Sequence, residues 1–302
     1  MAKTYLFKKI FRRLINDFYD IEWLPIQLFY IFSSKKYVKS KVLNLLNIQA
    51  LRIKIADTRL EKKRCVRAMS ADELNWINQL KNDGILIVPN ALSQEDVIQI
   101  NKTLELKTSN NQTSKHLINH KELADTGTTF DHIPLTDLGG GIIDSCAGKL
   151  VEIENTVELY LAKKVKSSWY VKIVKDNSSG GTAAGDTFCH SDTFHNTLKA
   201  WIYLDTIPAN GPSLKYFIGS HLMQPNVLDL HLARARADTS RSPRIDSSVI
   251  SDLGFEKFDE KIVAGTLILA DTRGFHYRNH SPNWTKKRAT IYASFRPSPF
   301  WG

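Results

Sequence analysis

The chain has few cysteines and no apolar run long enough to cross a membrane. The apolar stretch over residues 23–32 has ten residues, whereas a membrane-spanning helix needs about 20. Three cysteines in 302 residues make no disulfide framework, which favours a reducing compartment. No internal repeat or low-complexity segment is visible. The length allows one sizeable domain with an appendage.

Acidic residues are scarce at the N-terminus. Residues 1–69 hold 16 of the 41 Lys and Arg residues but only 5 of the 31 acidic residues, a net charge of +11. The remaining residues carry a net charge of −1. This division argues against a nucleic-acid-reading enzyme. It predicts a basic helical extension over residues 1–69 and a near-neutral domain over residues 70–302.

The start of the extension has the pattern of a helix that lies in a membrane interface. Apolar residues recur at helical spacing from Leu6 to Phe18, beside a basic cluster made of Lys8, Lys9, Arg12 and Arg13. Acidic residues at 17, 20 and 22 flank the apolar stretch that follows and prevent it from spanning the membrane. We therefore expect residues 1–35 to hold a cytoplasmic protein peripherally on the anionic inner face of a membrane. Packing on the protein body or on a second subunit is the alternative.

Residues 70–302 predict helices followed by many short strands. Ser70 and Glu73 form a capping-box pattern, which predicts a helix over residues 71–82. We expect a strand over 85–89, a helix starting at Ser93, a polar active-site rim loop over 107–142, and a helix over 149–163. Short strands between turn residues predict a sandwich or barrel, with strands at 168–175, around His190, and at 198–205, 213–219, 265–271 and 288–295.

Two histidines and one aspartate form a candidate metal site. His190 and Asp192 are two residues apart, so on a strand they would point to the same face while Ser191 points away. His276 lies 86 residues after His190 and would have to be brought in by the fold. Two imidazoles and one carboxylate are the facial ligand set of non-heme Fe(II) oxygenases, which leaves open positions on the metal. His280 is a weaker candidate for the distal ligand.

The sequence segments around these residues resemble those of a known protein family. Residues 198–221 after the His-X-Asp pair, residues 265–276 before the distal histidine, and the strand and helix at 83–100 are similar to the phytanoyl-CoA dioxygenase family. These are Fe(II)/2-oxoglutarate-dependent oxygenases. The resemblance covers roughly residues 70–300. It implies a double-stranded β-helix (jelly-roll, cupin-like) with flanking helices, Fe(II) as metal, and 2-oxoglutarate and O2 as co-substrates.

The resemblance also implies where 2-oxoglutarate binds. Arg288 and Thr290 would share the inner face of the last strand, and a buried arginine needs a counter-charge. The C5-carboxylate of 2-oxoglutarate, held by Arg288 with Thr290, would supply it. Trp201 and Lys172 are further candidates for this pocket. A structural Arg–Asp pair is the alternative for Arg288, and Lys287 and Arg296 are weaker carboxylate partners.

The implied reaction is hydroxylation of an unactivated C–H bond in a small molecule, a lipid or a lipid-linked glycan. Asp192 occupies the position that related halogenases leave to a halide, which favours hydroxylation. An insert at residues 223–261 carries four arginines that are expected either to close over the site and hold an anionic substrate or to form a solvated loop: Arg234, Arg236, Arg241 and Arg244. His195 is expected at the rim, as a substrate contact or a structural residue.

Two other classes of function remain open at this point. A zinc hydrolase could use the same two histidines and one carboxylate with an open water position. A non-catalytic, membrane-associated β-sandwich could retain the motif only as scaffold. Consumption of 2-oxoglutarate separates the first from an oxygenase, and iron-dependent release of succinate excludes the second.

Overall fold

The computed structural model describes residues 31–35, 37–38, 43–44, 46–63, 70–109, 119–123, 128–176, 185–236, 244–279, 281, 284 and 287–300. The basic helix predicted over residues 4–18 lies outside these residues, as does the apolar stretch up to residue 30. Among the helices of the described part, none combines the length and the apolar character needed to cross a bilayer.

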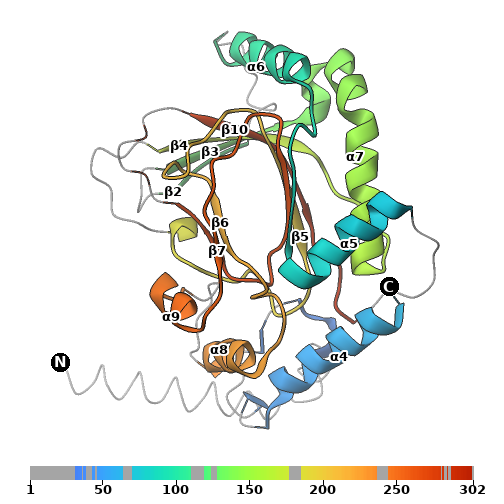
Figure 1. Cartoon of the computed structure of the whole chain (residues 1–302), viewed down its shortest axis with the longest axis vertical. Coiled ribbons are helices and arrows are strands. Elements are labelled where there is room, and N and C mark those ends of the chain that lie inside the picture. Colours follow the sequence, from blue (N-terminus) through green and yellow to red (C-terminus); the bar gives the residue numbers. More distant parts are fainter. Residues whose placement is uncertain are drawn as a thin grey trace, which may run out of the picture.

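Two antiparallel sheets form the centre of the molecule (Figure 1). The larger sheet has the strand order β1-β8-β5-β10-β4-β3-β2, and the smaller one has the order β7-β6-β9. The larger sheet contains β1 (Ile85–Val88), β2 (Asn119–Leu123), β3 (Thr128–Pro134), β4 (Tyr170–Asp176), β5 (Leu198–Tyr203), β8 (Leu267–Asp271) and β10 (Arg288–Phe295). The smaller one contains β6 (Leu214–Phe217), β7 (Lys257–Phe258) and β9 (His276–Arg278). The expectation of a mainly β protein with flanking helices is confirmed.

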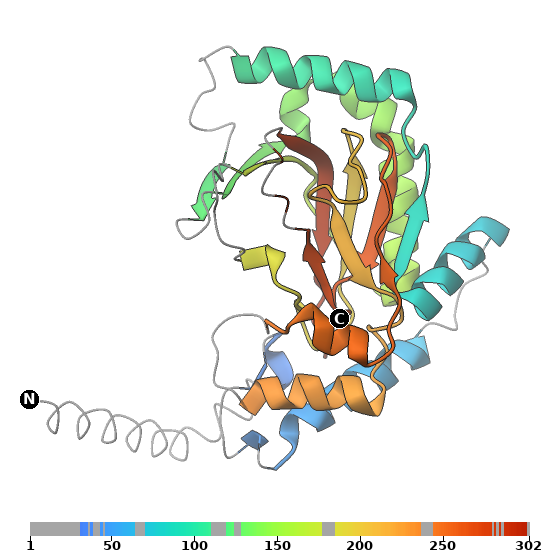
Figure 2. The same ribbon diagram turned by 60° about the vertical axis from the view of Figure 1, so that its left-hand side comes forward.

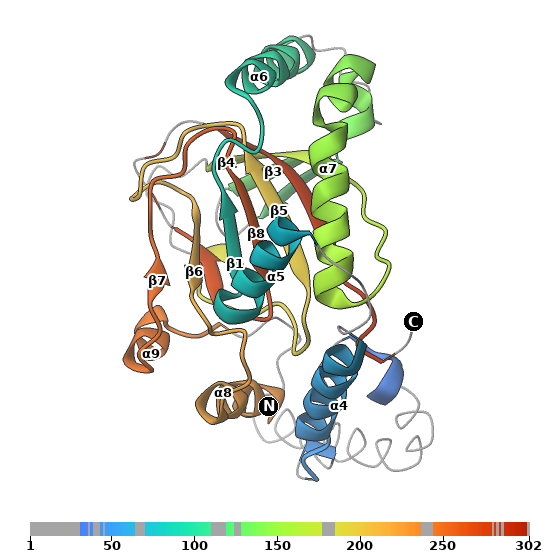
Figure 3. The same ribbon diagram turned by 45° about the vertical axis from the view of Figure 1, so that its right-hand side comes forward.

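Helices cover one side of the larger sheet and lie at both ends of the molecule (Figures 1 and 3). From residue 46 onward, the described residues include the α-helices α4 (Ile48–Lys63), α5 (Ala71–Asp83), α6 (Gln94–Ser109), α7 (Gly140–Leu161), α8 (Pro225–Arg236) and α9 (Ser247–Asp252). The part of the chain that the structure describes also contains the short 3-10 helices η1 (Leu135–Leu138) and η2 (Gly185–Thr187). Helices α5, α6 and α7 share one hydrophobic core with the outer face of the larger sheet. Helices α4 and α8 lie together at one end of the molecule (Figure 2).

Side chains of strand β10 alternate between the two faces of the larger sheet, one packed against the helices and the other facing the smaller sheet. Its odd-numbered residues enter the core beneath the helices: Ala289, Ile291, Ala293 and Phe295. Successive side chains on a strand point to opposite faces, so Arg288, Thr290 and Tyr292 face the smaller sheet. Trp201 and Tyr203 of β5 belong to the core between the sheets. The prediction that Arg288 and Thr290 share an inner face is therefore confirmed.

Helix α5 begins where the capping pattern predicts. The Ser70 hydroxyl accepts from the Glu73 backbone N–H at 3.2 Å, and the Glu73 carboxylate accepts from the Ser70 N–H at 2.9 Å. These bonds satisfy two of the backbone donors that a helix start leaves unpaired. The helix ends at Gly84, which adopts a left-handed φ of 75°. A side chain there would collide with Tyr216 and His221, so both the backbone and the packing require glycine.

The prediction of an active-site rim loop over residues 107–142 is wrong. This segment contains β2, β3 and η1, and α7 begins at Gly140 rather than near residue 149. The polar composition of this segment predicted a loop, but strand β3 forms there and buries Phe130 and Ile133. The three glycines at 139–141 suggested a loop, but Ile142 and Cys146 are buried at helical spacing just beyond them. Tertiary packing outweighs the low helix propensity of glycine here.

Candidate metal centre

Backbone pairing brings the three predicted ligands together. The His190 N–H donates to the His276 carbonyl and the His276 N–H donates to the His190 carbonyl, both at 2.9 Å. The Asp192 N–H donates to the Thr272 carbonyl at 2.8 Å. His190 lies in an isolated bridge instead of the predicted strand, while His276 opens β9. One potential ligand atom from each of His190, Asp192 and His276 lies within 4.8 Å of the others.

Both histidines present the same ring nitrogen to this cluster. His190 Nδ1 lies 2.8 Å from the Phe188 carbonyl, and His276 Nδ1 lies 2.9 Å from the Gly274 carbonyl. A carbonyl oxygen only accepts, so each Nδ1 carries the proton and each Nε2 keeps its lone pair. Burial lowers the pKa of His190 to about 3 and lowers the pKa of His276. Neutral imidazoles with a free Nε2 are the form that binds metals.

The two carboxylate oxygens of Asp192 have different surroundings. Oδ2 accepts from Lys199 Nζ at 2.6 Å and from an Arg296 guanidinium nitrogen at 3.1 Å. Oδ1 lies 3.7 Å from His190 Nε2, inside the ligand cluster. Burial alone would raise the pKa of Asp192, but the nearby charges, with Lys199 the strongest, bring it below its ordinary value. Asp192 is therefore ionised, as a metal ligand must be.

Arg288 and Thr290 lie on the inner face of β10. Both side chains are buried, and the Arg288 guanidinium donates to the Pro212 carbonyl. Its central carbon lies 6.0 Å from the centre of the Tyr203 ring, on the neighbouring strand β5. Thr290 is paired with Tyr203 in the register of these strands. A buried arginine beside a hydroxyl and an aromatic ring can receive one end of a dianionic ligand.

Lys172 and Trp201 lie on the same inner face. Lys172 is directly opposite Thr290 in the β4–β10 register, and its Nζ lies 4.7 Å from the Phe130 ring centre and 5.3 Å from that of Tyr292. Burial lowers the pKa of Lys172 to about 8. Trp201 is opposite Tyr292, with ring centres 6.0 Å apart. The four predicted co-substrate residues thus come from three adjacent strands and share one face.

Sequence reasoning missed Lys199 as a neighbour of the site and assigned Arg296 only a weak role. Lys199 alternates along β5 with Leu198 and Ala200, which are buried beneath the helices. It therefore points to the inner face, where a lysine needs a partner. That alternation is the signal that could have drawn attention to Lys199. Arg296 directly follows β10, and nothing in its local sequence indicates Asp192 as its partner.

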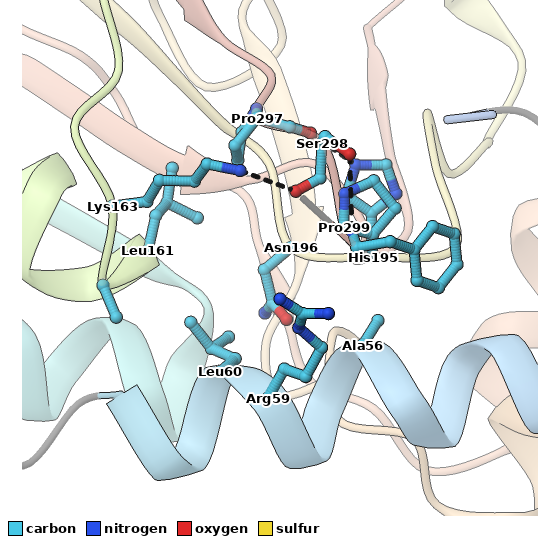
Figure 4. A pocket seen from close by; sticks show the side chains of 12 residues that line it. Ala56, Arg59, Leu60, Leu161, Lys163, His195, Asn196, Pro297, Ser298 and Pro299 are labelled. Carbon is cyan, nitrogen blue, oxygen red and sulfur yellow. Dashed lines mark hydrogen bonds between the residues drawn. The ribbon is translucent and has the colours of Figure 1, made fainter. Parts of the chain in front are cut away.

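His195 lines a pocket whose lining includes none of the three candidate ligands (Figure 4). This pocket is lined by α4, the end of α7 and residues 297–300, with Arg59 and Lys163 among its side chains. His195 Nε2 lies 3.2 Å from the Pro297 carbonyl and therefore donates to it. Burial lowers the pKa of His195 to about 3. The role expected for His195 at the rim of the metal site is thus not supported by its position.

The predicted arginine insert is partly helical. It contains α8, α9 and β7, in place of one continuous loop. Arg241 and the side chains of Arg234 and Arg236 lie outside the described residues, as does His280. Arg244 is exposed, and its charge contributes to lowering the pKa of His190 and His276. Whether the insert holds a substrate stays a prediction.

The chain shares its fold with solved structures of non-heme α-ketoglutarate-dependent enzymes. One is the epimerase SnoN in complex with Fe3+, alpha ketoglutarate and nogalamycin RO, at 17% identity and a TM-score of 0.53 over 75% of this chain and 84% of that one. Another is the carbocyclase SnoK from nogalamycin biosynthesis, at 14% identity and a TM-score of 0.50 over 75% and 83% of the two chains. At such identities the likeness establishes the fold alone. No protein-family model and no curated protein matches the sequence.

Proposed function

We propose that this protein is an Fe(II)/2-oxoglutarate-dependent oxygenase with a double-stranded β-helix (jelly-roll) fold, related to the phytanoyl-CoA dioxygenase family. The observation that carries the proposal is the set of two free Nε2 atoms and one ionised carboxylate within 4.8 Å. Two nitrogen ligands and one oxygen ligand fit a divalent iron and leave its other positions open. SnoN and SnoK, which share the fold, are both described as α-ketoglutarate-dependent.

The residues of the inner face have separate roles in this proposal. Arg288 and Thr290 hold the C5-carboxylate of 2-oxoglutarate, and Lys172 adds positive charge from the opposite strand. Trp201 forms an apolar wall beside them. The anchored Nδ1 atoms of His190 and His276 keep the imidazoles oriented. Bound Fe(II) would supply the chemistry of O2 activation, which no amino-acid side chain provides.

We propose hydroxylation of an unactivated C–H bond as the outcome of the reaction. Asp192 supports this, because the carboxylate fills the place that halogenases of this type leave to a halide. The fold by itself does not fix the outcome, since SnoN is an epimerase and SnoK a carbocyclase. The proposed substrates are a small molecule, a lipid or a lipid-linked glycan.

One experiment separates this function from its rivals. The full-length protein is incubated with Fe(II), O2, 2-oxoglutarate and fractions of a lipid and metabolite extract, and succinate is quantified alongside a mass gain of 16 in any fraction component. An oxygenase forms succinate only with iron, and the Asp192→Ala variant forms none. A hydrolase that works with Zn2+ and leaves 2-oxoglutarate intact would contradict the proposal. A folded protein inert under every condition would favour a scaffold.

We further propose that residues 1–35 place the enzyme peripherally on the anionic, cytoplasmic face of a membrane. The support is in the sequence, where basic residues and an apolar stripe share the predicted helix over residues 4–18. Each basic residue near an anionic surface contributes about 1 kcal/mol. Substrates retained at such a surface, such as lipids or lipid-linked glycans, would then be concentrated near the site.

A further inference from the structure

Asp192 is held by two positively charged side chains on the oxygen that faces away from His190. Lys199 Nζ lies 2.6 Å from Oδ2, and an Arg296 nitrogen lies 3.1 Å from the same oxygen. Oδ1 lies 3.7 Å from His190 Nε2. The Lys199 and Asp192 side chains are only 14% and 9% exposed, so solvent screens this pair weakly. The two oxygens of this carboxylate are thus assigned to different partners.

The sheet positions the Lys199 and Arg296 side chains beside Asp192. Lys199 is on β5, the strand between β8 and β10, and is paired with Ala270 and Ser294. A lysine inside a sheet sandwich is costly unless its charge is paired. Arg296 comes from the end of β10 and approaches the same oxygen from outside, with a half-exposed side chain. Side chains from β5 and from the residue after β10 therefore converge on one oxygen of one candidate metal ligand.

We propose that Lys199 and Arg296 are positioning residues that restrict Asp192 to binding the metal through Oδ1 alone. The inference rests on the proposed function, because it concerns the same metal centre. A carboxylate bound through one oxygen occupies one position on the metal rather than two, which leaves one more position for a chelating 2-oxoacid. The positive charge of Lys199 also lies beside the ligand cluster, 2.6 Å from Asp192 Oδ2. It opposes the binding of a divalent cation and favours the binding of a dianion.

This role predicts effects of opposite sign on two ligands. In the Lys199→Met variant, Asp192 Oδ2 loses the nearer of its two cationic partners and becomes more available to the metal, and a nearby positive charge is gone. The affinity for Mn(II), used as a redox-stable stand-in for Fe(II), should rise by about tenfold. The affinity of the Mn(II)-loaded protein for 2-oxoglutarate should fall by about tenfold, because a coordination position and a favourable charge are both lost. General loosening of the site would weaken both ligands together.

The measurement is isothermal titration of the full-length protein with Mn(II), followed by titration of the Mn(II)-loaded protein with 2-oxoglutarate. Lys215→Met is the matched control, because Lys215 is also buried and ion-paired, with Asp259, but lies on β6 outside the ligand cluster. Lys199→Arg keeps the charge and should retain both wild-type affinities. Arg296→Met, at a half-exposed position, should show shifts of the same opposite signs and smaller size.

The outcomes separate this inference from the proposed function. Opposite shifts in Lys199→Met, absent from Lys215→Met, establish the positioning role. Unchanged affinities, or two affinities that fall together, mean that Lys199 only neutralises Asp192 and overturn the inference. If the wild-type protein binds Mn(II) but not 2-oxoglutarate, the proposed function fails. The Mn(II) arm then still decides the inference, since tighter binding by Lys199→Met supports it and unchanged or weaker binding overturns it.

Discussion

Asp57 of α4 forms a two-bond ion pair with Arg273, three residues before the candidate ligand His276. The Arg273 guanidinium nitrogens lie 2.5 Å and 2.9 Å from the two Asp57 carboxylate oxygens. The Arg273 side chain is only 4% exposed. Its backbone N–H donates to Asp271 at 3.0 Å, so Arg273 also helps to shape the loop that carries His276. A helix from the basic N-terminal region is therefore attached to the ligand loop.

Removing Asp57 should destabilise the fold. Asp57→Ala leaves Arg273 buried without its carboxylate partner, and breaking a buried pair in this way costs about 3 kcal/mol or more. Urea denaturation measures the loss in free energy of unfolding. Lys54→Ala, at an exposed position on the same helix, is the control and should change stability little. Equal stability of the two variants would show that the ion pair does not hold α4 in place.

Replacing His276 should remove metal binding, whereas replacing His195 should not. His276→Ala deletes one of the two free Nε2 atoms, and Mn(II) affinity should fall more than about 100-fold, beyond the usual effect of outer-shell changes. His195→Gln should keep the wild-type affinity, because His195 bonds to the Pro297 carbonyl in a pocket that none of the candidate ligands lines. Titration calorimetry compares the two. Loss of metal in both variants would indicate that His195 acts on the metal centre.

Arg288 should control the affinity for 2-oxoglutarate but not the affinity for metal. Arg288→Ala leaves one carboxylate of a buried dianion without its charged partner, at a cost of about 2 kcal/mol or more, which is about 30-fold in Kd. Arg59→Ala, on the exposed side of α4, is the matched control. Fluorescence or calorimetric titration with 2-oxoglutarate gives both values. An unchanged Kd in Arg288→Ala would move the carboxylate site to Lys172 or Lys287.

Lys172 gives the protein a pH dependence above neutrality. Burial lowers its pKa from 10.5 to about 8 in the folded protein, so the unfolded chain binds the proton more tightly. Below pH 8 the fold bears the full cost of burying the charge, and this cost disappears as pH rises from about 8 to 10.5. Unfolding free energy should therefore increase across that window, by up to about 3 kcal/mol. Lys172→Met should be more stable at pH 7 and lack the increase.

The same deprotonation should weaken co-substrate binding. As pH rises through about 8, Lys172 loses the charge that would attract a dianion. The affinity of the metal-loaded protein for 2-oxoglutarate should fall over this range in the wild type and stay flat in Lys172→Met. A flat profile in both proteins would show that Lys172 does not contact 2-oxoglutarate.

The proposed membrane contact is best tested with a truncation that stops at residue 30. Arg52 is buried and donates to the Ile31 and Ser34 carbonyls at 2.6 Å, so a deletion through residue 35 would also disturb the folded part. The intact protein should co-sediment with vesicles containing anionic lipid at low salt, and less so at high salt. The truncated protein should remain in the supernatant. An intact protein that also remains there would assign residues 1–30 to packing or assembly.

The sequence predicted the features that depend on short-range pattern. Strand periodicity placed Arg288 and Thr290 on one face, and the capping residues Ser70 and Glu73 located the start of α5. The spacing of His190 and Asp192 marked the candidate ligands, although a bridge at His190 and a bend at Asp192, not a strand, hold them. These signals are visible because a local backbone conformation fixes where the side chains point.

Other features depend on partners that are remote in sequence. Arg296 meets Asp192 across 104 positions, and Arg273 meets Asp57 across 216. No local sequence pattern identifies which acidic side chain pairs with which basic side chain, because many such side chains are chemically alike and only the folded structure brings particular ones together. Strand β3 and the first turns of α7 escaped prediction for a related reason. Their burial by distant elements overrides the polar and glycine-rich composition of residues 107–142.

The visible spectrum of the anaerobic Fe(II)–2-oxoglutarate complex tests whether this protein is an Fe(II)/2-oxoglutarate-dependent oxygenase. When a 2-oxoacid chelates Fe(II) through its keto and carboxylate oxygens, a visible charge-transfer band appears. Titration of the full-length protein with Fe(II) and 2-oxoglutarate in the absence of O2 should produce this band at one iron per chain. It should be absent in Asp192→Ala and His276→Ala and should require more 2-oxoglutarate in Arg288→Ala. A folded wild-type protein that binds Fe(II) but develops no band would contradict the account.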